Sequence, residues 1–167
     1  MLELSLRRRL RVARALRTRR RVAAGPTVLA ALLAGTAMLG ALAVVSVAVY
    51  GESPWTIPRM MAAIVLGPGA LEPQDEFDLA VVATGLAVHC ALALVYALVL
   101  ATLVKDLPRG AAPAAGLAFG IGLYFANLYG FTQLFPWFAP LRTADTIAAH
   151  ALFGLVAARV LVPGHRR

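Results

Sequence analysis

The sequence predicts an all-α membrane protein that crosses the bilayer four times. Of its 167 residues, 60% are hydrophobic and only 14% are charged, and the mean hydropathy is +0.78. Globular domains in water contain about 45–50% apolar and about 25% charged residues. The apolar residues also gather in long runs that lack charge, which a lipid environment favours. The composition therefore excludes an ordinary water-soluble domain.

Four of these runs are long enough to be membrane-spanning helices. A helix rises about 1.5 Å per residue, so about 20 residues cross a hydrocarbon core of about 30 Å. The predicted spans are 27–49, 79–104, 111–135 and 146–162. The last run lies at the short end of the range and contains Arg159 near its end. Together with their connections, these spans form a predicted transmembrane domain over residues 27–167.

The positions of Lys and Arg predict the orientation of the spans. Loops rich in these residues stay on the cytoplasmic side of a bacterial inner membrane. A four-pass arrangement puts 14 of the 16 cations on one side: the N-terminal tail, Lys105, Arg109, Arg159 and the last two residues. Only Arg59 and Arg142 fall on the other side. Both termini are therefore predicted to be cytoplasmic.

Residues 1–26 form an Arg-rich tail with the pattern of a basic amphipathic helix. Nine of the 16 cations lie between Arg7 and Arg21. Apolar side chains recur among them at spacings of three and four, at Leu2, Leu6, Leu10, Ala13 and Leu16. We expect this tail to lie on anionic lipid headgroups. Specific nucleic-acid binding is not indicated, because no aromatic residues alternate with the arginines.

The two outer loops share a motif, which reads GESPWTIPRM in the first and LFPWFAPLRT in the second. Trp55 and Arg59 in the first correspond to Trp137 and Arg142 in the second. Each motif follows a Gly-containing span and precedes a span with one histidine. This repetition predicts two parallel copies of one helix hairpin, related by a rotation about the membrane normal.

Interfacial positions are expected for the two motif tryptophans, because amphipathic rings are enriched at the boundary between lipid and water. The two arginines are expected to pair with outer-loop carboxylates such as Glu52 or Asp145, or with lipid phosphate. The first loop also contains an apolar segment at about 58–71. It is too short to span, so we expect an interfacial or re-entrant element.

Small residues at spacing four predict the helix contacts, since close approach of backbones drives association in lipid. The third span carries two such ridges, one with Gly116 and Gly120 and the other with Gly122. It is therefore predicted to be the central helix, packed on both sides. The helix faces that carry the histidines in the second and fourth spans also consist of small residues. Such faces favour contact with other helices, so His89 and His150 are predicted to lie inside the bundle.

Three interpretations of these buried histidines remain open at this stage. In the first, each ring joins helices by hydrogen bonds to neighbours such as Tyr124 or Asn127. A second interpretation is axial ligation of a b-type haem by His89 and His150. A third is a proton or ion route, although no Asp or Glu lies within a predicted span.

The sequence contains no catalytic signature and predicts that the protein is not an enzyme. There is no GxSxG, HExxH or phosphate-binding loop, and the glycines have the spacing of helix packing. A single cysteine, Cys90, excludes an internal disulfide and a Cys-rich zinc site, and is expected to be an inert packing residue.

Three segments together resemble a group of small uncharacterised bacterial inner-membrane proteins. They read SPWTIPRMMAAIVLGPGAL, VHCALALVYALVLA and NLYGFTQLFPWFAPLR. Some members of this group carry the label sodium:proline symporter. The resemblance covers about residues 31–162 and implies a bacterial inner membrane and a four-pass fold. It carries over no functional residue.

These observations predict an accessory or scaffolding membrane protein, which acts as a homo-oligomer or with another membrane protein. A small transporter or channel is the alternative, based on the buried histidines and the repeated arginines. A b-type haem protein is the further alternative.

Overall fold

The computed structural model describes residues 22–162, and every regular element in this range is helical. Four helices are long and apolar enough to cross a membrane: α2 (Ala24–Tyr50), α4 (Leu79–Val104), the third span (Ala112–Gln133) and α6 (Ala144–Leu161). Each boundary lies within three residues of its predicted position. The predicted amphipathic helix falls on residues 1–21, outside the described residues, whereas the last three residues of the predicted tail belong to α2.

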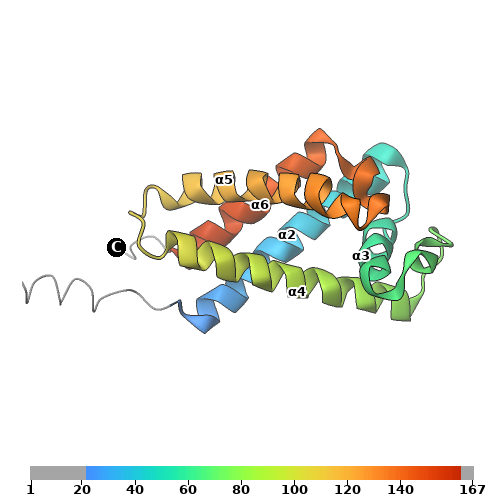
Figure 1. The fold of residues 1–167 in the computed structure, drawn as a ribbon, viewed down its shortest axis with the longest axis horizontal. Coiled ribbons are helices and arrows are strands. Elements are labelled where there is room, and N and C mark those ends of the chain that lie inside the picture. The colour runs from blue at the N-terminus through green and yellow to red at the C-terminus, as the bar shows by residue number, and fades with distance from the viewer. Residues whose placement is uncertain (1–21, 163–167) are drawn as a thin grey trace, which may run out of the picture.

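The four long helices form a bundle in which α6 is central (Figure 1). α6 packs extensively against α5 (Ala112–Phe125) and α2, and also contacts α4. α2 also packs against α4, whereas α4 and α5 make few contacts with each other. The prediction of a central third span was therefore wrong, because only one of its two small-residue ridges meets another helix.

The third span is not one regular helix. After α5 the chain makes a wide π-helical turn, η2 (Ala126–Gly130), and a short 3-10 turn, η3 (Phe131–Gln133). A second 3-10 segment, η4 (Pro136–Leu141), then leads into α6. The predicted end of this span at residue 135 lies beyond the helix, because the apolar sequence continues after the helical geometry ends.

The apolar segment of the first outer loop folds as a short helix, α3 (Thr56–Leu66), followed by η1 (Pro68–Leu71). Gly67 lies between them with φ of 86°, a left-handed conformation that other residues adopt at a cost. α3 packs against α4, where the Pro58 carbonyl lies so close to Gly85 that a Cβ there would overlap it. As Figure 1 shows, α3 crosses the end of the bundle and does not run along it.

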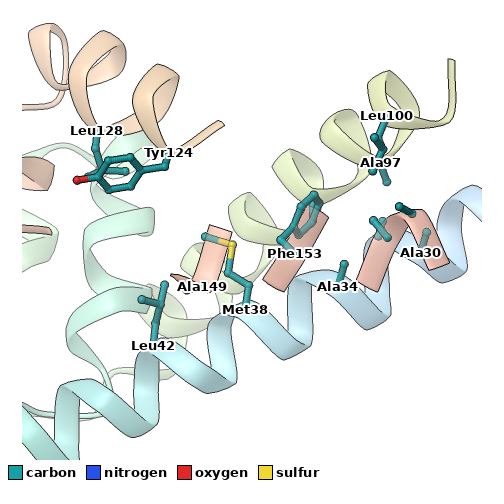
Figure 2. Close-up of a cluster of buried hydrophobic side chains, with 14 of the residues drawn as sticks. Ala30, Ala34, Met38, Leu42, Ala97, Leu100, Tyr124, Leu128, Ala149 and Phe153 are labelled. Atoms are coloured by element: carbon teal, nitrogen blue, oxygen red, sulfur yellow. The ribbon is translucent and has the colours of Figure 1, made fainter. Parts of the chain in front are cut away.

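The core is built from small residues on α2, α4 and α6 and from a few large ones. Figure 2 shows Ala34 and Met38 on α2 and Ala97 on α4, with Phe153 of α6 nearby. Phe153 is only 2% exposed, and its ring meets the ring of Tyr96 edge-on. Small residues on three helices therefore bring the backbones together around the ring of Phe153.

Candidate functional site

Three side chains from three spans form a chain of hydrogen bonds inside the bundle. Tyr96 of α4 donates its hydroxyl to Oδ1 of Asn127 (2.7 Å), and Nδ2 of Asn127 donates to Nε2 of His150 on α6 (3.3 Å). Nδ1 of His150 donates to the carbonyl of Thr146 (2.8 Å). Because a carbonyl only accepts, the proton lies on Nδ1, and Nε2 is the acceptor for Asn127. Neutral groups thus join α4, η2 and α6.

The wide turn η2 places Asn127 in this chain. Tyr124 lies just before η2 and is buried, and its ring meets the His150 ring edge-on with 5.8 Å between centroids. The structure thus brings together three of the four predicted buried polar residues, Tyr124, Asn127 and His150.

His89, the fourth predicted residue, binds a different helix. Its Nε2 lies 3.0 Å from the carbonyl oxygen of Gly35 on α2, so this nitrogen carries the proton and donates. A Cβ at residue 35 would press against the imidazole, so glycine allows this close approach. The ring is 8% exposed, which confirms the prediction that it lies inside the bundle, as does the 4% exposure of His150. Each histidine joins two elements through a main-chain or amide group.

This hydrogen bonding does not suit the haem interpretation. Axial ligation needs a ring nitrogen with a free lone pair from each histidine. Both nitrogens of His150 are already engaged, one as a donor to Thr146 and the other as an acceptor from Asn127. A haem iron at His150 would therefore have to displace the Asn127 amide. In residues 22–162, no group of three or more His, Cys, Asp or Glu side chains is placed to hold a metal ion.

The two motif arginines bind main-chain carbonyls, so the expected pairing with Glu52 or Asp145 was wrong. Arg59 is 2% exposed and donates from Nη1 to the carbonyls of Ala70 (3.0 Å) and Glu72 (3.4 Å), and from Nη2 to that of Glu76 (2.8 Å). Its guanidinium therefore holds the loop that follows η1.

Arg142, in the second outer loop, also binds a segment of irregular backbone. It donates from Nε to the carbonyl of Leu128 (2.8 Å) and from Nη2 to Oγ1 of Thr132 (2.8 Å). Its guanidinium also lies over the Tyr129 ring, 4.6 Å from the centroid. Both arginines thus stabilise irregular backbone. The predicted carboxylates bind hydroxyl groups instead, since Glu52 accepts from Ser46 and Asp145 accepts from Tyr50.

The motif tryptophans, both half-buried, make different contacts. Trp137 donates its indole N–H to the carbonyl of Met60 (3.1 Å), which fastens η4 to α3. Trp55 packs its ring against Phe77, with 4.8 Å between centroids. The repeated sequence motif therefore produces two different local structures. Whether either ring lies at the lipid boundary stays a prediction.

The three predicted packing glycines divide into two groups. A Cβ at Gly116 would overlap the carbonyl of Gly154, and one at Gly120 would overlap the carbonyl of His150, so α5 and α6 meet backbone to backbone. Gly122 lies on the exposed face, where an added Cβ would meet nothing within 4 Å. The prediction that Gly122 packs within the bundle was wrong. Cys90 is also exposed, so it does not pack in the interior as expected.

Sequence reasoning missed Tyr96 and Gly35 as partners in this site. Tyr96 was visible only as a polar residue in a span, and Gly35 contributes a main-chain carbonyl that no side-chain pattern reveals. A comparison of the chain with protein-family models, curated protein sequences and solved protein structures found no match in any of the three. The functional proposal therefore depends on the geometry described above.

Proposed function

We propose that the chain is a four-pass protein of the bacterial inner membrane with both termini in the cytoplasm. Four long apolar helices support this proposal, as does the position of the start of α2 and the end of α6 at one end of the bundle (Figure 1). The turn with Lys105 and Arg109 joins α4 to α5 at that same end. The Arg-rich tail of residues 1–26 then faces anionic headgroups on the cytoplasmic side.

Two parallel hairpins, α2 with α4 and α5 with α6, make up the proposed transmembrane domain. Within each pair the two long helices pack together, and the second helix of each pair carries one buried histidine. The packing between the pairs is unequal, because α2 packs closely on α6 while α5 barely meets α4. The sequence repeat thus relates one hairpin to the other, whereas the packing of the two hairpins in the bundle is asymmetric.

An accessory or scaffolding role, without enzymatic chemistry, is the function that the geometry supports best. The observation that carries it is the exposed small-residue ridge of the third span: Ala118, Gly122, Ala126 and Gly130. A Cβ added at either of its two glycines would meet no atom of residues 22–162 within 4 Å, and the ridge carries no charge. Such ridges let a second helix approach closely in lipid. A second copy of this chain is the proposed occupant, because a symmetric dimer places the same ridge on both sides of the interface.

The test compares two glycines that are both exposed and both free of neighbours. Gly122→Leu fills the ridge, whereas Gly40→Leu adds the same side chain to the exposed face of α2. We expect wild type and Gly40→Leu to be dimers in mild detergent by light scattering, and Gly122→Leu to be a monomer with unchanged thermal stability. A monomeric wild type, or a Gly122→Leu dimer, would contradict the proposal.

A small transporter or channel is the second candidate, favoured by a cavity that both histidines line. No Asp or Glu lines this cavity, so a cation would meet imidazole, amide and hydroxyl groups only. Solute or ion flux in proteoliposomes that is lost in both His89→Ala and His150→Ala would support this function. Absence of flux across a broad panel of ions and solutes would contradict it.

A further inference from the structure

A cavity of about 170 Å³ lies inside the bundle between α4 and the third span. Met38 of α2 and Phe153 of α6 contribute to its walls, and Ile57 of α3 and Phe138 of η4 close one end. The cavity is not fully enclosed, and α4 and α5 make few contacts with each other, so its opening lies at the side of the bundle. Phe131 lines this opening and is 47% exposed. In a four-pass arrangement, this side faces lipid.

His89 gives the cavity wall a hydrogen-bond acceptor for which the described residues offer no partner. His89 lines the cavity, and its protonated Nε2 is used by the Gly35 carbonyl. The other nitrogen, Nδ1, has no hydrogen-bond partner among the described residues, and it is not sealed off by protein atoms. In the neutral ring this nitrogen carries a lone pair. A ligand group that donates a hydrogen bond would satisfy it.

A hydrogen-bond donor lies on the opposite wall. Asn127 lines the cavity from the third span and has two amide hydrogens, of which one is used by Nε2 of His150. The second amide hydrogen is uncommitted among the described residues. The cavity therefore offers one acceptor and one donor, whereas the other polar side chains on its walls, those of Tyr96, Thr146 and His150, already have partners. A hydroxyl group matches both, since it donates once and accepts through its oxygen.

The size and lining of the cavity indicate what carries that hydroxyl. An engineered protein cavity of about 150 Å³ holds one benzene ring, so about 170 Å³ accommodates a single substituted ring. Four phenylalanines and one tyrosine line the walls: Phe131, Phe135, Phe138, Phe153 and Tyr96. An acyl chain would also fit the volume but would leave the lone pair of His89 unsatisfied.

We infer that this cavity binds a membrane-soluble molecule whose head is one hydroxylated ring, the chemistry of an alkylated phenol or quinol. The ring lies among the phenylalanines, its hydroxyl donates to Nδ1 of His89, and its alkyl tail leaves between α4 and α5 into lipid. This inference is independent of whether two copies of the chain assemble, because the described residues that line the cavity belong to one chain.

The first experiment fills the cavity without removing a hydrogen bond. Leu92 lines the cavity, whereas Leu94 lies on the exposed face of the same helix. We expect 4-pentylphenol to raise the unfolding temperature of wild type and Leu94→Trp in detergent, but not that of Leu92→Trp. Equal shifts in the two tryptophan variants would place the phenol outside the cavity. No shift in wild type would also overturn the inference.

The second experiment tests the hydroxyl. Wild type is expected to bind 4-pentylphenol about tenfold more tightly than pentylbenzene, the size of effect that one or two hydrogen bonds produce. His89→Phe should lose this preference, while Thr102→Val, a polar-to-apolar change on the exposed face of α4, should keep it. Equal binding of pentylbenzene and the phenol to wild type would assign the cavity to apolar chains. Decylubiquinol should bind like the phenol, and its exclusion would contradict the exit of the tail into lipid.

Discussion

Arg59 is a charged residue that is buried and therefore needs hydrogen-bond partners from the protein. Its guanidinium is almost completely buried, has no carboxylate partner among the described residues, and is held by three main-chain carbonyls. A buried charge is costly unless polar groups surround it, and in return it satisfies carbonyls that would otherwise lack donors. The loop between α3 and α4 thus depends on one side chain.

We therefore expect Arg59→Met to lower the free energy of unfolding by about 2–4 kcal/mol, because the buried Ala70 carbonyl loses its donor and the loop up to Glu76 loses two further hydrogen bonds. Arg142→Met is the matched control. Arg142 is itself exposed, and the Leu128 carbonyl that it contacts keeps the Thr132 hydroxyl as a donor, so the loss should stay below about 1 kcal/mol. Denaturant unfolding in detergent measures both changes. Equal losses would contradict this account, and a loss seen only with anionic lipid would indicate phosphate binding by Arg59.

Asn127 is the second residue on which a specific prediction depends. It accepts from Tyr96 and donates to His150, so its removal leaves the half-buried Tyr96 hydroxyl and the buried His150 ring without this partner. We expect Asn127→Leu to be destabilising, and a double-mutant cycle with Tyr96→Phe to give a coupling energy of about 0.6 kcal/mol, the usual value in membrane proteins. Tyr50→Phe with Asn127→Leu is the control cycle, because Tyr50 bonds to Asp145. Additive losses in the Tyr96 cycle would exclude this hydrogen bond.

Side-chain patterns predicted which residues of the site are buried, but only some of their partners. The small residues one turn before and after His89 and His150 place both rings inward, as found. The partner of His89 is the carbonyl of Gly35, and no side-chain pattern reports the position of a carbonyl. Asn127 reaches His150 only because η2 widens the helix, a change of geometry that apolar periodicity does not encode.

At the scale of elements, the contact between α5 and α6 depends on glycine. Gly120→Ala places a Cβ on the His150 backbone, so the helices must separate, and we expect a loss of at least about 2 kcal/mol in the free energy of unfolding. Gly122→Ala should stay within about 0.5 kcal/mol of wild type, because nothing lies near its added methyl. Unfolding in detergent compares the two. Equal stabilities would show that α5 and α6 do not meet at Gly120.

Element boundaries were predictable where apolar character and helical geometry end together. α4 begins after Asp78, whose carboxylate accepts from the backbone N–H groups of Ala80 and Val81, and its predicted range matches the structure. The third span differs. Its sequence stays uncharged through Phe135, yet the regular α-helix ends at Phe125. Hydropathy reports the solvent that a segment prefers and carries no information on whether its turns are α, π or 3-10.

At the scale of the whole molecule, the number of long apolar helices was predictable and their arrangement was not. The third span has two small-residue ridges, which suggested a helix with neighbours on both sides. In the structure α6 takes the central position, because its small face accommodates Gly116 and Gly120 while it also packs on α2. A ridge predicts that a close approach is possible, and the partner is decided by the competition among all the helices.

The orientation of the bundle in the membrane follows from which of its ends carries the positive charges. If the two hairpins are inserted in parallel, the turn between α4 and α5 lies in the cytoplasm and the loop between α3 and α4 lies outside. We expect green fluorescent protein fused after Arg109 to fluoresce, and alkaline phosphatase fused after Asp75 to be active, because each reporter works on only one side of the membrane. Exchanging the two reporters should abolish both signals. An active phosphatase after Arg109 would place the Lys105 and Arg109 turn outside, against the positive-inside rule, and would overturn the proposal that both termini are cytoplasmic.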